Sequence, residues 1–241
     1  MTITIKFNDN GPHDYRSFEE IVQLDNYNEI IFINSSYNNI YTLPELPNSL
    51  QSLWCDNNSL YSLPKLPNSL TRLHCSFNKL SILPELSNPL QLLWCDNNSL
   101  SSLPELPTSL IELHCSGNNL SSLPNLPNSL TNLWCNYNKI SKLPKLPNSL
   151  NVLYCYGNNL SSLPKLPNSL IHFNYNNNPI YSHIKTYFNG NEKKYFENER
   201  DMERIFVNKI GIWFLDCKYN PKYLYCRKRL INEYNELYNG K

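Results

Sequence analysis

One short repeated sequence motif constrains what this chain can fold into. Leu-Pro-x-Leu-Pro-Asn-Ser-Leu, or a close variant of it, returns every twenty residues, seven times in succession. The copies begin at Leu43, Leu63, Leu83, Leu103, Leu123, Leu143 and Leu163. A fixed period of this length indicates a solenoid, in which each repeat packs only on its neighbours. Such a fold presents a long regular surface rather than an enclosed pocket, and it therefore favours binding over catalysis.

Alternation inside each repeat predicts a short strand. Leu53 and Cys55 alternate with Ser52, Trp54 and Asp56, the period-two pattern of a strand buried on one face. Six cysteines share the inward position, namely Cys55, Cys75, Cys95, Cys115, Cys135 and Cys155. Side chains on neighbouring parallel strands stand ~4.8 Å apart and do not converge, so we expect buried free thiols here rather than disulfides.

An asparagine follows each strand, and a pair of prolines follows the asparagine. The asparagines occupy positions 38, 58, 78, 98, 118, 138, 158 and 178. An amide at such a bend can satisfy backbone groups that the bend leaves unpaired. Because proline fixes φ and lacks a donor, the return path cannot be a helix, and we expect an extended, polyproline-like convex side.

The motif Leu-x-x-Leu-x-Cys-x-x-Asn-x-Leu, as found from Leu50 to Leu60, resembles the leucine-rich repeat, with Cys in place of the third leucine. The resemblance covers residues 43–182. The Leu-Pro-x-Leu-Pro phrase is similar to that of secreted bacterial effectors, and the abundance of Asn is similar to leucine-rich-repeat proteins of giant viruses that infect amoebae. The resemblance implies an α/β solenoid with a parallel β-sheet on its concave side.

Residues 1–42 have the features of an N-terminal cap and half repeat. Thr2 to Phe7 alternates like a strand, and Ser17-Phe18-Glu19-Glu20 has the form of a capping box that opens a short helix to about Leu24. Residues 29–42 match half a repeat, with Ile30, Ile33 and Ile40 at the leucine positions and Ser35 at the cysteine position. An array needs such a cap because a terminal repeat otherwise exposes its core.

Residues 183–241 are predicted to form a helical C-terminal cap or a small effector segment. Three helices are predicted from their apolar faces. The first face is formed by Ile180, Ile184, Tyr187 and Phe188, the second lies within Met202 to Cys217, and the third helix begins at Asn220-Pro221. Related bacterial effectors often carry a ubiquitin-ligase domain with a Cys-x-Asp nucleophile. Neither Cys217 nor Cys226 has this motif, so the alternative function is an adaptor, for example in ubiquitin-pathway recruitment, that acts through these helices.

The residue before each inward cysteine is aromatic in six repeats and predicts a stripe along the concave face: Trp54, His74, Trp94, His114, Trp134 and Tyr154. Flanking rows add Arg72 and Glu112 on one side and Asp56, Asp96 and Tyr156 on the other. Exposed Trp and Tyr often anchor protein interfaces, so we expect a partner-binding surface. Two alternatives remain open. The rings could simply stabilise the sheet by stacking, or their alternation could be a relic of duplication, since Trp-Cys-Asp-Asn-Asn-Ser-Leu occurs twice.

The sequence favours a non-enzymatic scaffold that binds a protein partner, a host protein if the chain is viral. No catalytic order of Ser, His and Asp, phosphate loop or paired-acid site stands out, and no cofactor is implied. His74 and His114 lie two strands apart, ~10 Å, too far to share a zinc ion, so no metal is expected. Asp56, Asp96 and Glu112 would repel phosphates, which argues against nucleic acid.

Location and assembly are less constrained by the sequence. The start of the chain lacks the features of a signal peptide, and no apolar run is long enough to span a membrane. We therefore expect an intracellular protein, in the host cytoplasm if viral, without membrane contact. Self-association through exposed aromatics or the terminal helices is a further possibility.

Overall fold

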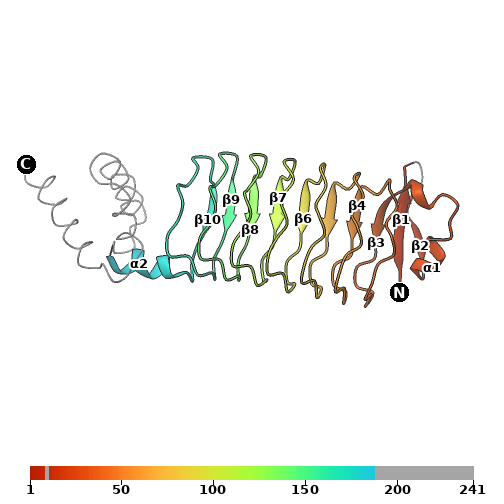
Figure 1. The fold of residues 1–241 in the computed structure, drawn as a ribbon, viewed down its shortest axis with the longest axis horizontal. Helices are drawn as coiled ribbons and strands as arrows, with labels where there is room; N and C mark the ends of the chain where they lie inside the picture. The colour runs from red at the N-terminus through yellow and green to blue at the C-terminus, as the bar shows by residue number, and fades with distance from the viewer. Residues whose placement is uncertain (9–10, 188–241) are drawn as a thin grey trace, which may run out of the picture. The chain divides into compact units, whose positions relative to one another are not determined.

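The repeats form a solenoid with one continuous β-sheet. The computed structural model describes residues 1–8 and 11–187, and the chain divides into two units, Met1–Ser182 and His183–Lys241. The first unit holds a ten-stranded sheet in the order β10-β9-β8-β7-β6-β5-β4-β3-β1-β2. Figure 1 shows the strands side by side, each followed by a loop that returns to the start of the next strand. The parallel-strand solenoid expected from the period is confirmed.

Each repeat contributes one strand of three residues. The strands are β4 (Ser52–Trp54), β5 (Arg72–His74), β6 (Leu92–Trp94), β7 (Glu112–His114), β8 (Asn132–Trp134), β9 (Val152–Tyr154) and β10 (His172–Asn174). Neighbouring strands are parallel and pair in a register of twenty residues, with Leu73 facing Leu53 and Leu93 facing Leu73. The sequence period therefore equals the sheet register, and every side-chain type forms a row across the strands.

The core is a stack of leucine and cysteine rows. In the repeat that starts at Leu83, for example, Leu93, Cys95 and Leu100 are fully buried, and their counterparts in the neighbouring repeats are buried as well. The six inward cysteines are free thiols without exposed area. Burial raises the pKa of all six, to about 12 for Cys155, so these thiols stay neutral and behave as small apolar side chains.

The asparagines form a hydrogen-bonded ladder behind the strands. The Nδ2 of Asn118 donates to the carbonyls of Cys95, Cys115 and Ser116 at 3.0, 3.1 and 3.2 Å, and its Oδ1 accepts from the backbone N–H of Leu100 at 3.0 Å. One amide thus serves the bend of its own repeat and the bend of the preceding repeat. This arrangement confirms that the asparagines satisfy backbone groups at the turn, and it ties neighbouring repeats together.

The return path contains no helix between residues 35 and 178. It runs from the asparagine through the prolines and closes with a turn, as where the N–H of Leu70 donates to the carbonyl of Pro67 at 3.1 Å. The hydroxyl of Ser69 donates to the carbonyls of Asn48 and Leu50, each at 2.7 Å, so a second ladder joins the repeats on this side. The absence of a helix here agrees with the expectation from the sequence, because the prolines leave no stretch of return path that can form helical hydrogen bonds.

The N-terminal cap combines expected and unexpected elements. β1 (Ile3–Phe7) was predicted, as was the half repeat, whose strand β3 (Ile30–Asn34) pairs in parallel with β4. β2 (His13–Tyr15) and the 3-10 helix η1 (Tyr27–Glu29) were not predicted. β1 lies antiparallel between β2 and β3, and it therefore interrupts the parallel order at this end of the sheet.

Helix α1 (Phe18–Ile21) is shorter than expected. Ser17 caps it by accepting from the N–H of Glu20 at 3.4 Å, but the Glu20 carboxylate accepts from the N–H of Arg16 instead of that of Ser17. The predicted end at Leu24 is wrong, because the N–H of Leu24 bonds to the carbonyl of Ile21 in a turn. The capping motif fixed the start of the helix and not its end.

Thr2 ends the asparagine ladder. Its N–H donates to Oδ1 of Asn38 at 2.8 Å, and its carbonyl accepts from Nδ2 of the same side chain at 2.8 Å. The backbone of one residue thus replaces the preceding repeat that Asn38 lacks. At the other end, α2 (Pro179–Tyr187) forms the first expected helix. The predicted second and third helices lie outside the described residues.

Asn118→Ala is expected to destabilise the first unit by about 2–4 kcal/mol, because the substitution leaves several buried backbone groups unpaired. Asn119→Ala is the matched control, since Asn119 is exposed and its side chain makes no hydrogen bond within the described structure. Urea unfolding of both variants, followed by far-UV circular dichroism, measures the difference. Equal midpoints would show that the ladder does not carry this share of the stability.

Candidate binding surface on the strand face

The outer side of strands β4 to β9, here called the strand face, brings together the side chains predicted as a stripe. The middle residue of each strand points into the core, and the residues on either side of it point outward. The residues that form the aromatic ladder are Trp54, His74, Trp94, His114, Trp134 and Tyr154. Their backbones pair directly across the sheet, so the structure confirms that they form one row.

The rings of the aromatic ladder pack on one another. The centroid of Trp54 lies 5.2 Å from that of His74 with 8° between the planes, and that of His74 lies 4.1 Å from Trp94 with 20°. Trp94 and His114 are 4.9 Å apart at 16°. Beyond His114 the stacking loosens, to 46° at Trp134 and to an edge-on contact of 6.0 Å at Tyr154. Ring faces in the stacked part are therefore covered, and mainly ring edges remain for solvent or a partner.

Exposure along the aromatic ladder is uneven. Trp54 is 37% exposed, His74 only 9%, and the other members are intermediate. His74 is the least exposed member because the indoles of Trp54 and Trp94 stack on its two sides. Phe32 pairs with Ser52 and so begins the flanking row, and its ring contacts Trp54 edge-on at 5.2 Å. Its position twenty residues before Ser52 was the signal that could have placed it in that flanking row.

Two carboxylates hold His114 in place. Oε1 of Glu112 lies 2.8 Å from Nε2 of His114 and also accepts from the indole N–H of Trp94 at 2.9 Å. On the other side, Oδ2 of Asp96 lies 3.7 Å from Nδ1 of His114. The structure thus joins Trp94, Glu112, His114 and Asp96 into one cluster that spans three of the predicted rows.

Asp56 and Asp96 occupy the same row and make the same bond. Each carboxylate accepts from a backbone N–H at 2.7 Å, that of Ser76 for Asp56 and that of Ser116 for Asp96. Burial raises the pKa of both carboxyls, to about 6 for Asp56. Among the described residues neither is paired with a lysine or arginine. These half-buried charges thus lack a full countercharge.

His74 contributes a buried polar atom to the strand face. Its Nε2 is buried and has no hydrogen-bond partner within the described part of the chain. Burial, with a smaller contribution from His114, lowers the pKa of His74 to about 4, so the ring is neutral at pH 7. Arg72, its neighbour on β5, is exposed.

A second row, here called the turn row, follows the strand face at the bend of each repeat. Every member has a left-handed backbone, with φ between 50° and 66°: Tyr37, Asn57, Phe77, Asn97, Gly117, Tyr137, Gly157 and Asn177. Asn and Gly tolerate this conformation, whereas bulky residues are strained in it. Tyr37, Phe77 and Tyr137 are nevertheless aromatic, and they are 78%, 52% and 60% exposed.

Tyr137 connects the turn row with the strand face. Its ring meets Tyr156 edge-on at 4.8 Å. It also lies over Gly157, where a Cβ would stand 2.8 Å from Cδ1 of the tyrosine. Glycine at 157 therefore leaves room for this ring. Tyr156, predicted as a flanking residue, thus packs against Tyr137, a contact that the alternating pattern of the strands does not reveal.

The histidines do not come together. Trp94 stacks between His74 and His114, which agrees with the distance expected from the strand spacing. Within residues 1–8 and 11–187, no group of three or more His, Cys, Asp or Glu side chains is placed to hold a metal ion. No described helix is long and apolar enough to cross a membrane.

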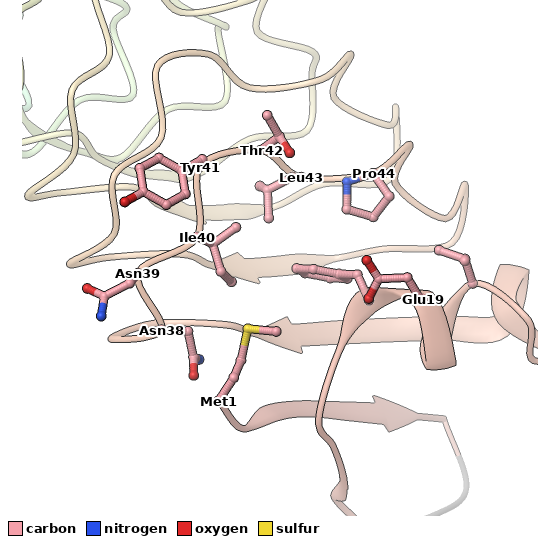
Figure 2. Close-up of a pocket in the computed structure, with 11 residues that line it drawn as sticks. Met1, Glu19, Asn38, Asn39, Ile40, Tyr41, Thr42, Leu43 and Pro44 are labelled. Atoms are coloured by element: carbon pink, nitrogen blue, oxygen red, sulfur yellow. The ribbon is translucent and has the colours of Figure 1, made fainter.

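The described cavity lies at the N-terminal cap. It has a volume of about 460 Å³ and lies between α1 and residues 38–44, with Met1, Val22 and Tyr41 on its walls. Figure 2 shows Glu19 on one side and the chain from Asn38 to Pro44 on the other. Helix α1 occupies the sequence positions of a preceding turn, twenty residues before residues 38–41.

Comparison with solved structures identifies the architecture. YopM from Yersinia enterocolitica is similar, with 41% sequence identity and a TM-score of 0.62 over 62% of this chain and 34% of that one. A Shigella effector leucine-rich-repeat domain has 35% identity and a TM-score of 0.53, covering 56% of this chain and 61% of that one. A leucine-rich-repeat protein of Leptospira interrogans has 32% identity and a TM-score of 0.55, covering 60% and 42%. No family model and no curated protein sequence matches the chain.

The first unit therefore has the architecture of a leucine-rich-repeat solenoid, and its twenty-residue repeats are similar to those of bacterial effectors. The chain spans about a third of the Yersinia enterocolitica protein and less than two thirds of the other two. The expected resemblance to giant-virus proteins stays a prediction, as do the binding role of the strand face and the division at residues 42 and 182.

Phe77→Asn is expected to stabilise the first unit by about 0.5–1 kcal/mol, because Asn adopts the left-handed backbone with less strain than Phe. The ring of Phe77 makes no aromatic contact within the described structure, so little packing is lost. Asn97→Phe is the reverse control and should destabilise by a similar amount. Urea midpoints of both variants measure the effect, and a less stable Phe77→Asn protein would contradict the strain argument.

His74→Phe is expected to change how stability depends on pH. The lowered pKa of His74 means that the unfolded chain binds its proton more readily, so the wild type loses stability as pH falls from 6.5 toward 4. The variant should avoid this loss, on the order of 1–2 kcal/mol. Asp56→Asn should act with opposite sign, since the raised pKa of Asp56 costs the wild type stability as pH rises from about 4 to 6. Urea unfolding at several pH values tests both, and parallel curves for wild type and His74→Phe would contradict the assignment.

Proposed function

We propose that the chain is a non-enzymatic scaffold that binds a protein partner on the strand face. The observation that carries this proposal is the continuous row of aromatic rings, held in register by the sheet and bordered by polar side chains. Leucine-rich-repeat folds of this kind commonly mediate protein–protein interaction. Tryptophan and tyrosine are also the residues most often found as interface anchors.

The turn row supports the same proposal independently. Tyr37 and Phe77 carry strained backbones and exposed rings, and the described structure gives neither ring an aromatic contact in return. Strain that brings no gain within the fold is a reason to look for function. The proposed surface therefore includes Tyr37 and Phe77 beside the aromatic ladder.

Stacking and binding are separable roles for the ladder. His74 and Trp94 lie within the stack, so their loss should mainly affect stability. Trp54 is exposed, and Trp134 lies where the stacking loosens. These two residues, rather than all three tryptophans together, are therefore the appropriate targets for a test of binding.

Trp54→Ser/Trp134→Ser is expected to reduce capture of a protein partner at least tenfold, since loss of an anchor typically costs 2 kcal/mol or more. The measurement is affinity capture from mammalian and amoebal lysates with quantitative mass spectrometry. Phe77→Asn should also weaken capture while the fold becomes more stable, an outcome that unfolding cannot explain.

Tyr61→Ser is the matched control, because Tyr61 is exposed on the return path at a distance from the strand face. A captured protein that is retained equally by the wild type, this control and the double variant would contradict binding on the strand face. The adaptor role through the C-terminal helices concerns residues outside the described structure and stays an alternative.

A further inference from the structure

The charges of the first unit are separated along the solenoid. Residues 1–112 hold five Lys and Arg against twelve Asp and Glu, a net charge of −7. Residues 113–182 hold four Lys and neither Asp nor Glu, a net charge of +4. Because the repeats stack in sequence order, the acidic residues all precede the middle of the array. A separation of this kind orients and attracts a partner whose own charges are distributed in the complementary way.

The strand face follows the same division. Its charged members, Asp56, Asp96, Glu112 and Arg72, all belong to the repeats of β4 to β7. The repeats of β8 and β9 supply only uncharged groups to the corresponding rows, namely Asn132, Trp134, Asn136, Val152, Tyr154 and Tyr156. The surface thus has an anionic half and an uncharged aromatic half, joined by the ladder.

The anionic half includes the exposed Arg72, but within the described residues no lysine or arginine forms an ion pair with its carboxylates. Asp56 has no basic partner among the described residues, and the only ion-pair neighbour of Asp96 there is His114. Burial lowers the pKa of His114 despite the two carboxylates beside it. Removing a carboxylate from water without a countercharge is costly. A cation delivered by a partner would offset that cost, and burial raises the pKa of both aspartates in the direction that this cost requires.

Most ring faces in the stacked part of the ladder are not available to bind that cation. A cation is attracted to the face of an aromatic ring and repelled by its edge. Between Trp54 and His114 the facing sides of neighbouring rings cover each other, so this stretch presents mainly ring edges. Recognition of positive charge on this half therefore depends on Asp56, Asp96 and Glu112.

We propose that the strand face binds a protein segment with two distinct halves, a basic half over β4 to β7 and an apolar or aromatic half over β8 and β9. This inference rests on the proposed function and specifies the chemistry of its partner. The ladder spans five strand intervals, about 24 Å, which an extended segment of about seven residues would cover. Arg and Lys side chains would pair with Asp56, Asp96 and Glu112, while apolar side chains would pack on Trp134, Tyr154 and Tyr156.

The probes for the test are three synthetic ten-residue peptides. The first has three Arg in one half and Leu and Tyr in the other half. The second has the same composition with Arg and apolar residues alternating, and the third has Glu in place of Arg. Fluorescence anisotropy against the full chain is expected to show the tightest binding for the first peptide, no measurable binding for the third, and weaker binding as salt is raised.

Asp56→Asn/Asp96→Asn is expected to weaken binding of the first peptide about tenfold or more, because both charge partners are lost. Glu85→Gln/Glu105→Gln is the matched control. It removes the same charge from exposed positions on the return path of the same half of the array and should change the affinity less than about threefold. Tm values of both variants verify that the fold is intact.

Two results would overturn the inference: equal affinity for wild type and Asp56→Asn/Asp96→Asn, or no preference for the first peptide over the other two. The protein-capture experiment separates this failure from failure of the proposed function. If capture depends on Trp54 and Trp134 but not on the two aspartates, the strand face is the binding surface and the proposal that its partner is basic is wrong.

Discussion

The amide of the repeated asparagine is the interaction on which the rest of this structure depends. Each amide accepts a backbone N–H from the preceding repeat and donates to carbonyls of two repeats, as Asn98 does toward Leu80, Cys75 and Cys95. Such bonds are made only if the neighbouring bends lie in a fixed register. An insertion in one repeat would break the bonds on both sides of it. The asparagine therefore holds the period at twenty and, with the period, the alignment of every other row.

Much of the first unit could be predicted because the period of the sequence repeat equals the register of the sheet. The buried leucines and cysteines, the half repeat with Ser35, and the parallel pairing follow from the spacing alone. The cap could not be predicted in the same way. β2 has no counterpart in the repeats, and the end of α1 depends on a local turn after Ile21. The reciprocal bonds between Thr2 and Asn38 join residues far apart in sequence that no periodic pattern relates.

The sequence was sufficient to predict which residues of the candidate surface lie in the same row. It was not sufficient to predict the burial and contacts of each side chain. Placing Trp54, His74 and Trp94 in one row required only the period. Knowing that His74 is covered by its neighbours requires the ring orientations, which side-chain packing decides. The turn row gave a partial signal, since Asn and Gly at most of its positions indicate a left-handed backbone. An aromatic residue at the same position, such as Phe77, keeps the conformation because the hydrogen bonds of the next residue, Asn78, impose it.

Duplication and selection can be told apart by asking which residues a copied unit would not supply. The segment from Trp54 to Leu60 is repeated without change from Trp94 to Leu100, so the alternation of the ladder and the matching aspartates follow from copying alone. Glu112 does not, because the positions equivalent to it hold Ser, Arg, Leu, Asn and Val in the neighbouring repeats. Yet Glu112 is the residue that accepts from the indole N–H of Trp94 and lies 2.8 Å from Nε2 of His114. The pair of Tyr137 and Tyr156 is likewise absent from the copied unit. These departures lie on or beside the strand face, one in each of its halves. The rows that form the core, by contrast, remain almost uniform, which places the individuality of this chain on the surface proposed to bind its partner.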